Sequence, residues 1–252
     1  MSLAPDWNNL ICEYISDFLN KQTLPYVVSQ SIPIVWFGNI DKYKASPKKI
    51  VTIGLNPSLN EFSESRFGTV DLTANDAADE LTNTLNLYFS YNPYKWFNNF
   101  EKALNQLDTS YYENKNKENI AVHIDIYSAI ATNPTWGGLY EYQQNEIQRI
   151  DLFKKLLNLL NPDVIIFSAN RAVFEQVFPD FNIIKSASCV TKKGLFLKKY
   201  QYKDKILFNV RNFRGQPFGG LTDYELQEAM QELLGDDNNT SNYTCDSDLK
   251  LW

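Results

Sequence analysis

The sequence predicts an α/β fold in which a mostly parallel sheet is covered by helices on both faces. Two observations predict it. Short apolar runs bounded by turn residues are typical of buried strands, and segments with apolar residues at helical spacing lie between them. Such alternation favours parallel pairing, because each crossover helix packs back onto the sheet. The chain has 252 residues, 44% of them hydrophobic, and we expect a single domain over residues 1–235 with an N-terminal helical extension.

Buried strands are predicted at Lys49–Leu55, Ile120–Ile126 and Val164–Phe167. Alternation in Leu195–Tyr200 and Lys205–Val210, around a Lys203-Asp204 turn, predicts a hairpin. Ser29–Gly38 is expected to be extended.

The helices follow from apolar spacing and from capping residues. Asn92-Pro93 provides a cap followed by proline at the first helical position, and Thr222-Asp-Tyr-Glu is a capping box. The predicted helices are Asp6–Leu19, Ala74–Leu85, one opened by Asn92-Pro93, Tyr142–Leu160, Arg171–Val177, and one from Thr222 to Leu234-Gly235. Asn60–Asn86 is predicted to be mostly a long functional loop, and the polar segment Asp108–Glu118 is expected to be exposed.

Composition argues against several classes of protein. One histidine and no paired cysteines argue against a zinc site, and we expect no metal or organic cofactor. The odd, widely spaced cysteines Cys12, Cys189 and Cys245 favour a reducing compartment, so we expect a cytoplasmic protein. No apolar run is long enough to span a membrane, and Met1–Asn20 lacks the basic start and apolar core of a secretory signal.

The net charge and the local distribution of charge point in opposite directions on whether the protein binds nucleic acid. The net charge of −6 disfavours a nucleic-acid partner. Between Asn182 and Arg214, however, only Asp204 opposes a run of basic residues, which are Lys185, Lys192, Lys193, Lys198, Lys199, Lys203, Lys205, Arg211 and Arg214. This run is either an electrostatic footprint for DNA or a solvated hairpin face. Residues 236–252 form an acidic tail that we expect to be flexible.

The candidate site follows from the fold. Ligands of parallel sheets bind beyond the carboxyl ends of the strands, which selects residues 54–67, 125–138 and 209–220. The first contains Gly54-Leu55-Asn56-Pro57-Ser58. Glycine lets the backbone approach a ligand closely, and an asparagine can hold water by its carbonyl oxygen while its amide binds elsewhere. A plain strand-to-loop turn is the alternative.

This segment, together with Arg66-Phe67-Gly68-Thr69-Val70, resembles the first motif of the uracil-DNA glycosylase superfamily, in its mismatch-specific and single-strand-selective branches. Those branches carry Gly-x-Asn-Pro-Gly, and Ser58 stands where they have the last glycine. The resemblance covers roughly Lys49–Gly220. It implies a three-layer α/β/α sandwich with a mostly parallel central sheet of four strands. It also implies that Asn56 positions the attacking water, that Phe67 stacks on a flipped base, that Gly54, Leu55 and Pro57 shape the base pocket, and that Ser58 contacts DNA.

Two departures leave the base preference open. Where many members read uracil with an asparagine, this sequence has Asp125, with His123 on the same strand face. An ionised aspartate only accepts hydrogen bonds, so it would repel uracil O4 but accept from an exocyclic amine. An ordinary strand-end acid and a packed structural histidine are the alternatives.

The second departure is the absence of the family's His-Pro-Ser motif. Here the last strand leads into Arg211-Asn212-Phe213-Arg214-Gly215-Gln216-Pro217. Asn209 or Asn212 would donate to the departing base, and Phe213 would fill the vacated stack. Arg211, Arg214 and Gly215 would contact DNA. The alternative is a surface turn rich in Gly and Pro.

These residues predict a monomeric DNA glycosylase that acts on uracil or another damaged base in single- or double-stranded DNA, as in base excision repair. An amide is not a strong base, so the enzyme is expected to be slow unless Glu61, Glu64 or Asp125 reaches the water. One alternative is an inactive relative that binds a nucleotide, a base or DNA. The other is an unrelated α/β small-molecule enzyme or interaction module. The common nucleophile-elbow, Walker and dinucleotide motifs are absent from the sequence.

Overall fold

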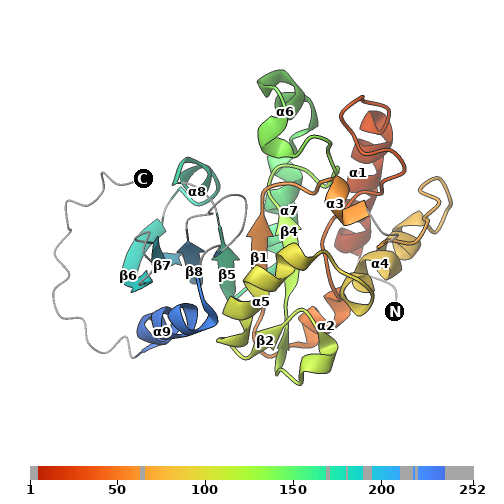
Figure 1. Cartoon of the computed structure of the whole chain (residues 1–252). Helices are drawn as coiled ribbons and strands as arrows, with labels where there is room; N and C mark the ends of the chain where they lie inside the picture. Colours follow the sequence, from red (N-terminus) through yellow and green to blue (C-terminus); the bar gives the residue numbers. More distant parts are fainter. Residues whose placement is uncertain are drawn as a thin grey trace.

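The protein is an α/β structure built on a mixed central sheet (Figure 1). The computed structural model describes residues 5–62, 66–168, 171–179, 181–189, 195–210, 218 and 221–235. Within them the sheet has six strands in the order β4-β1-β5-β8-β7-β6. Their bounds are β1 (Ile50–Gly54), β4 (Val122–Asp125), β5 (Val164–Phe167), β6 (Phe181–Cys189), β7 (Leu195–Tyr202) and β8 (Lys205–Val210).

The expectation of a mostly parallel four-stranded sheet is wrong. The four neighbours β4, β1, β5 and β8 are parallel, but β7 pairs antiparallel with β8, and β6 pairs antiparallel with β7. The predicted hairpin exists, and its first strand extends the sheet. The sequence analysis missed β6, which forms the far edge.

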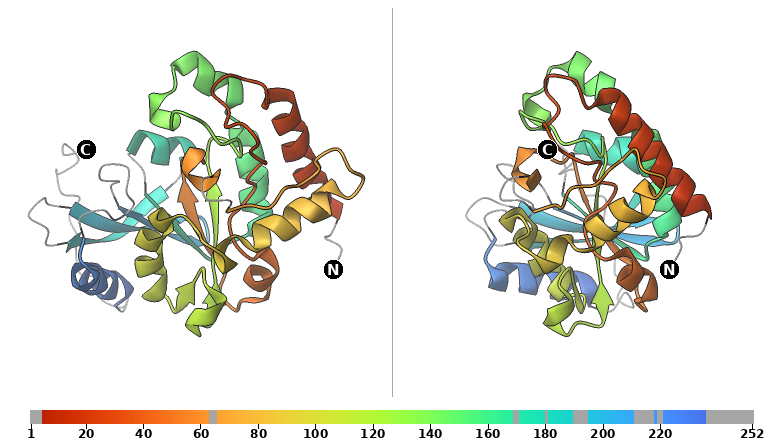
Figure 2. Two further views of the ribbon diagram at one scale, coloured as in Figure 1. Left: turned by 45° about the vertical axis from the view of Figure 1, so that its right-hand side comes forward. Right: turned by 90° about the vertical axis from the view of Figure 1, so that its right-hand side faces the viewer.

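The helices lie on both sides of this sheet. In Figure 2, α1 and α7 lie on one side, while α5 and α9 lie on the other. The helices are α1 (Pro5–Lys21), α2 (Ile40–Ala45), α3 (Leu59–Phe62), α4 (Ala77–Asn86), α5 (Asn98–Asn105), α6 (Glu141–Ile147), α7 (Ile150–Leu160), α8 (Arg171–Val177) and α9 (Asp223–Leu234). Short 3-10 turns occur at η2 (Tyr88–Ser90), η3 (Lys95–Phe97), η4 (Glu113–Lys115) and η5 (Trp136–Gly138). None of the helices described is long and apolar enough to cross a bilayer.

Two predicted helices need correction. The helix expected over Tyr142–Leu160 is divided into α6 and α7, because the Arg149 amide donates to the Tyr127 carbonyl instead of continuing a helical ladder. The helix expected to begin at Asn92-Pro93 begins at Asn98, after the turn η3. The prediction of α8 is confirmed, and so is the capping box of α9, where Thr222 and Glu225 bond reciprocally.

The segment Asp108–Glu118 is not uniformly exposed, as its polarity suggested. It contributes β2 (Thr109–Ser110), which pairs in parallel with β3 (Asn119–Ile120). Thr109 and Ser110 are fully buried. Glu101 on α5 satisfies this buried segment by accepting from the Ser110 hydroxyl at 2.5 Å and from the Tyr111 amide at 3.1 Å.

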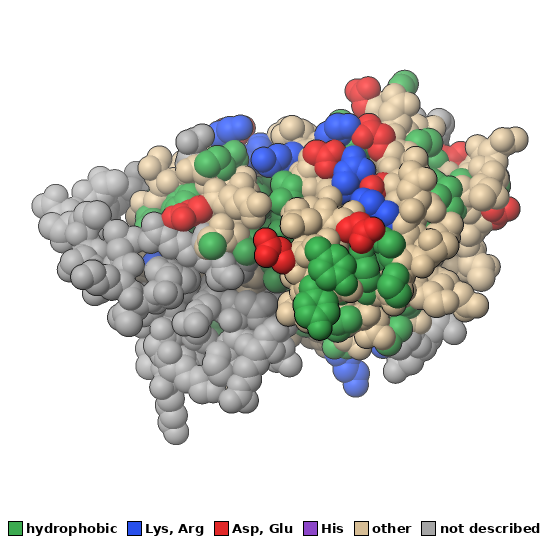
Figure 3. All heavy atoms as spheres, turned by 90° about the horizontal axis from the view of Figure 1, so that it is seen from above, with side chains coloured by type: hydrophobic (Ala, Val, Ile, Leu, Met, Phe, Trp, Pro, Cys, Tyr) green, Lys and Arg blue, Asp and Glu red, His purple; other side chains and the backbone are tan. Residues whose placement is uncertain are grey.

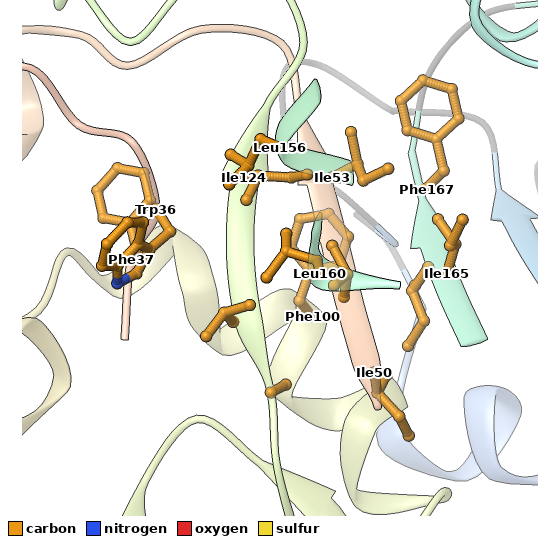
Figure 4. Packing of buried hydrophobic residues seen from close by; sticks show 14 of the residues in the cluster. Trp36, Phe37, Ile50, Ile53, Phe100, Ile124, Leu156, Leu160, Ile165 and Phe167 are labelled. Atoms are coloured by element: carbon orange, nitrogen blue, oxygen red, sulfur yellow. The ribbon is translucent and has the colours of Figure 1, made fainter. Parts of the chain in front are cut away.

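The core holds the carboxyl ends of the central strands in place. All five residues of β1 are buried, as expected for a strand covered on both faces. Figure 4 shows Ile53 and Ile124 of adjacent strands packed near Phe100 and Leu156, which come from helices on opposite sides. The segment Ser29–Gly38, expected to be extended, is largely buried but joins the sheet only through an isolated bridge from Phe37 to His123.

Candidate functional site

A cavity of about 360 Å³ lies at the carboxyl ends of β1, β4 and β5. This volume is within the usual range for small-ligand sites. The loop after β1, the end of β4 and Ser168 after β5 contribute polar side chains, while Phe37, the segment from Tyr94 to Phe100 and the turn η5 contribute aromatic rings. In Figure 1 the arrowhead of β1 marks the end of the sheet at which the cavity lies. The cavity therefore occupies the place where parallel sheets bind ligands.

Asn56 enters the cavity with its amide oriented by the surrounding chain. Its Nδ2 donates to the Pro57 carbonyl at 2.8 Å, to the Ile130 carbonyl at 3.1 Å and to the Thr132 hydroxyl at 3.3 Å. Its Oδ1 is buried and accepts no hydrogen bond from any residue described. A buried acceptor without a donor is costly, so Oδ1 is suited to receive a hydrogen bond from water or a ligand.

Glu61 supplies a buried carboxylate to the same cavity. It lies on α3 and is only 7% exposed. The Ser58 amide and hydroxyl donate to its Oε2 at 2.7 and 2.8 Å, which fixes the side chain against the turn after β1. Burial raises the pKa of Glu61 to about 7, against the lowering effect of the Ser58 hydrogen bonds, and the nearby charge of Asp125 raises it further. Ser58 thus positions Glu61 in this structure.

Asp125 and His123 lie together at the end of β4. Asp125 Oδ1 is 3.6 Å from His123 Nε2, and the two side chains are 6% and 1% exposed. His123 Nδ1 is 2.7 Å from the Thr52 hydroxyl, which also bonds to the Tyr111 hydroxyl. The predicted pairing on one strand face is therefore found. Both side chains line the cavity.

Gly54 explains how this pair fits against β1. A Cβ atom at Gly54 would lie 2.5 Å from Asp125 Oδ1 and 2.8 Å from His123 Nε2. Any side chain would therefore displace one of them. Leu55 follows and also lines the cavity, whereas Pro57 is buried beside it and accepts from Asn56 Nδ2 through its carbonyl.

The aromatic wall of the cavity is not the one that the sequence indicated. Phe67 is absent from the lining; its ring stacks on Tyr88 at 5.0 Å and 28°. The rings that do line the cavity are Phe37, Tyr94, Trp96, Phe97, Phe100 and Trp136. Trp96 and Phe97 fall in the segment that was predicted to form a helix after Asn92-Pro93, and Trp136 falls in the strand-end segment 125–138. No local pattern indicated that they meet.

Ser168 is a cavity residue that the sequence analysis missed. It follows β5, is 3% exposed, and its buried hydroxyl has no partner among the residues described. Its position directly after a parallel strand was the available signal. Asn209 is buried on β8 opposite Phe167 of β5 but does not line the cavity. Asn212, Arg211, Phe213, Arg214 and Gly215 lie outside the described residues, as does Glu64.

The predicted basic run is thinner on the surface than its sequence suggests. Lys199 is 4% exposed, and Lys205 bonds to Asn161 at 2.9 Å and pairs with Asp204 at 3.4 Å. Figure 3 looks onto the carboxyl-end side of the sheet. There, basic and acidic side chains are interspersed beside a group of hydrophobic ones. In the part that is described, this face carries no uniform basic surface.

Comparison with known proteins identifies no family: no protein-family model matches the sequence, and no curated protein matches it. In the described part of the chain, no three His, Cys, Asp or Glu side chains gather in a way that would hold a metal ion. The function must therefore be inferred from the chemistry of the cavity.

Proposed function

We propose that the protein hydrolyses the N-glycosidic bond of an altered base in DNA. The observation that carries this proposal is the orientation of Asn56. Its amide nitrogen is fully engaged with the chain, while its carbonyl oxygen is buried and unpartnered beside a ligand-sized cavity. This is the arrangement needed to hold a water molecule for attack on a sugar.

The cavity suits a flat base taken out of the nucleic-acid stack. Its aromatic rings offer faces on which a base can stack, and such stacking contributes about 1–3 kcal/mol per base. The order of the parallel strands β4-β1-β5-β8, with helices on both sides, supports a three-layer arrangement of the uracil-DNA glycosylase type. The edge strands β7 and β6 would then be additions to that arrangement.

The mechanism assigns separate tasks to Asn56 and Glu61. As the glycosidic bond breaks, its electron pair leaves with the base, and the sugar gains oxocarbenium character. Water held at Asn56 Oδ1 then forms a bond to the anomeric carbon. The proton of that water passes to the Glu61 carboxylate, because the Asn56 amide is too weak a base to accept it. Because burial raises the pKa of Glu61 to about 7, its carboxylate is a better proton acceptor than an ordinary glutamate.

A second candidate is binding of a base or nucleotide without hydrolysis. The observation that favours it is charge. Two carboxylates, Glu61 and Asp125, face the cavity, and the chain as a whole carries −6. Both features weaken the attraction for a DNA backbone. This candidate predicts base binding that continues unchanged when Glu61 is replaced by glutamine, with no base release.

The test is base release from labelled oligonucleotides carrying uracil, hypoxanthine, xanthine, mismatched thymine, or ring-methylated cytosine or adenine, as single and double strands. Wild type, Asn56→Ala and Glu61→Gln would be measured together, with Asn145→Ala on the exposed part of α6 as a surface control. We expect release of at least one of these bases by wild type and the control, and a loss of about 10²-fold or more in both site variants. Glutamine can still accept both Ser58 hydrogen bonds, so Glu61→Gln remains informative if Asn56→Ala unfolds. Full activity of Asn56→Ala, or no release of any of these bases by wild type, would overturn the proposal.

A further inference from the structure

Three of the polar side chains that line the cavity, Asn56, Glu61 and Asp125, present hydrogen-bond acceptors to it. Asn56 offers Oδ1 but not its nitrogen, which already makes three hydrogen bonds. Glu61 and Asp125 offer carboxylate oxygens, and the buried Ser168 hydroxyl, which can donate as well as accept, has no partner among the residues described. A ligand that fills this part of the cavity must therefore supply donors, because buried acceptors left unpaired are costly.

Asp125 is the acceptor whose surroundings are most clearly defined. Among the residues described, none donates a hydrogen bond to its carboxylate, and His123 Nε2 is 3.6 Å from Oδ1. The hydroxyls behind His123 are consistent with one direction of donation, in which Tyr111 donates to Thr52 and Thr52 donates to Nδ1. In that arrangement Nδ1 accepts from Thr52, so Nε2 is the ring nitrogen left to donate, and it faces Asp125 Oδ1. The carboxylate oxygens of Asp125 offer only hydrogen-bond acceptors to a ligand.

Aromatic rings line the same cavity as this carboxylate and offer faces to a flat ligand. Trp96, Phe97 and Phe100 surround His123 with ring centroids 5.1 to 5.4 Å away. Trp136, stacked on Tyr127 at 4.4 Å, lines the cavity from the turn η5. A planar heterocycle in this space would meet Asp125 with its edge and the rings with its faces.

We propose that the base accepted by this cavity carries an amino group at the edge that meets Asp125, as adenine- and cytosine-type rings do, and not the carbonyl of uracil or hypoxanthine. This inference rests on the proposed function for its biological setting, and it names the substrate class of that site. The carbonyl oxygen of uracil would face a carboxylate oxygen, which is repulsive, whereas an exocyclic amine would donate to it.

The charge of the cavity indicates how such a base would differ from the ordinary ones in DNA. Alkylation at a ring nitrogen gives an amino-bearing base a positive charge, which carboxylates and aromatic faces both stabilise. A cationic base leaves the sugar as a neutral molecule, so the bond breaks without a donor to balance a developing negative charge. Ring-alkylated cytosine or adenine is therefore the chemical type that we expect to be released.

The experiment exchanges the acceptor for a donor without changing its size. Binding of free cytosine, adenine, uracil and hypoxanthine would be measured by calorimetry with the full chain, for wild type and Asp125→Asn. Asp76→Asn, the same substitution on the surface at the start of α4, is the control. We expect wild type and control to bind the amino-bearing bases at least about tenfold more tightly, and Asp125→Asn to reverse that order, because an asparagine amide can donate to a carbonyl.

Release assays separate this inference from the proposed function. Oligonucleotides would carry N3-methylcytosine, N3-methyladenine, uracil or hypoxanthine. Release of the methylated amino-bearing bases by wild type, with a gain of uracil release in Asp125→Asn, supports both proposals. Reversed binding without any release supports this inference and overturns hydrolysis. This inference is overturned if wild type releases uracil or hypoxanthine or binds them more tightly than the amino-bearing bases. It is also overturned if Asp125→Asn leaves the order of affinities unchanged. In both cases the proposed hydrolysis is decided by the Asn56→Ala and Glu61→Gln assay alone.

Discussion

At the scale of single residues, the site depends on a close approach between two adjacent strands. Gly54 ends β1 where Asp125 ends β4, and the two residues are partners in the parallel register. The space that a Cβ would need is occupied by Asp125 Oδ1 and His123 Nε2. A glycine here is what allows a carboxylate to stand directly beside the strand that carries Asn56.

Gly54→Ala adds only one methyl group, but we expect it to lower both the stability of the fold and the affinity for a base. We expect a loss of about 1–3 kcal/mol in the free energy of unfolding, because the surrounding core is closely packed, and a loss of base binding of about tenfold or more. Chemical denaturation and calorimetry would measure the two effects. Gly68→Ala is the matched control, since nothing lies within 4 Å of its Cβ position. Equal effects of the two substitutions would contradict this account of the strand contact.

Glu61 should make stability and activity respond to pH in opposite directions. Burial raises its pKa from an ordinary 4.5 to about 7, so the folded protein binds this proton more tightly than the unfolded chain. The stability that the proton contributes is fully present below pH 4.5 and is lost as pH rises through about 7. Activity needs the ionised form, so base release should increase over the upper part of the same range.

Glu61→Gln tests the sign of both effects. The variant should gain stability relative to wild type between pH 5 and pH 8, on the order of 3 kcal/mol, because it no longer buries a charge. Chemical denaturation at the two pH values measures this gain, and the rate of base release should lose its rise near pH 7. A stability difference that is the same at both pH values would show that Glu61 titrates normally in the folded protein.

At the scale of elements, apolar patterning located most of the fold. Val164–Phe167 and Arg171–Val177 coincide with β5 and α8, because a buried run and a helical period are both local properties of the sequence. The division between α6 and α7 has no such signal, since both helices continue one periodic pattern. It arises from the hydrogen bond between the Arg149 amide and Tyr127, residues distant in the sequence.

The site was predictable in part for the same reason. Asn56, Asp125 and His123 follow from strand ends and from the alternation of strand faces, both of which the sequence displays. The residue predicted to stack on the base, Phe67, packs on Tyr88 instead. The rings that line the cavity come from segments that only the tertiary fold brings together. Ser168 was missed because a single serine after a strand has no pattern of its own.

The turn η5 is held to the cavity by a side chain of α6. Gln144 Nε2 donates to the Trp136 carbonyl at 2.9 Å and to the Leu139 carbonyl at 3.4 Å. Gln144→Ala should cost only about 1 kcal/mol of stability, yet weaken base binding several-fold by releasing Trp136. Calorimetry of base binding measures this, with Gln148→Ala, which removes a bond only to Asn145, as the control. Unchanged binding in Gln144→Ala would mean that Trp136 is held by its stacking on Tyr127 alone.

At the scale of the whole molecule, charge should set how this protein meets nucleic acid. The chain carries −6, and the described face around the carboxyl ends of the strands mixes acidic and basic side chains. Proteins that neutralise many phosphates lose affinity steeply with salt, because each contact releases counterions. We expect few phosphate contacts, and a logarithmic salt slope for single-stranded DNA shallower than about −4. Recognition would then depend on the base in the cavity more than on the backbone.

Fluorescence anisotropy with an oligonucleotide at several salt concentrations measures the slope. A slope steeper than this value, and equal for intact and altered DNA, would show that the backbone dominates binding, and it would direct attention to the basic residues between Asn182 and Arg214 as the principal DNA contact.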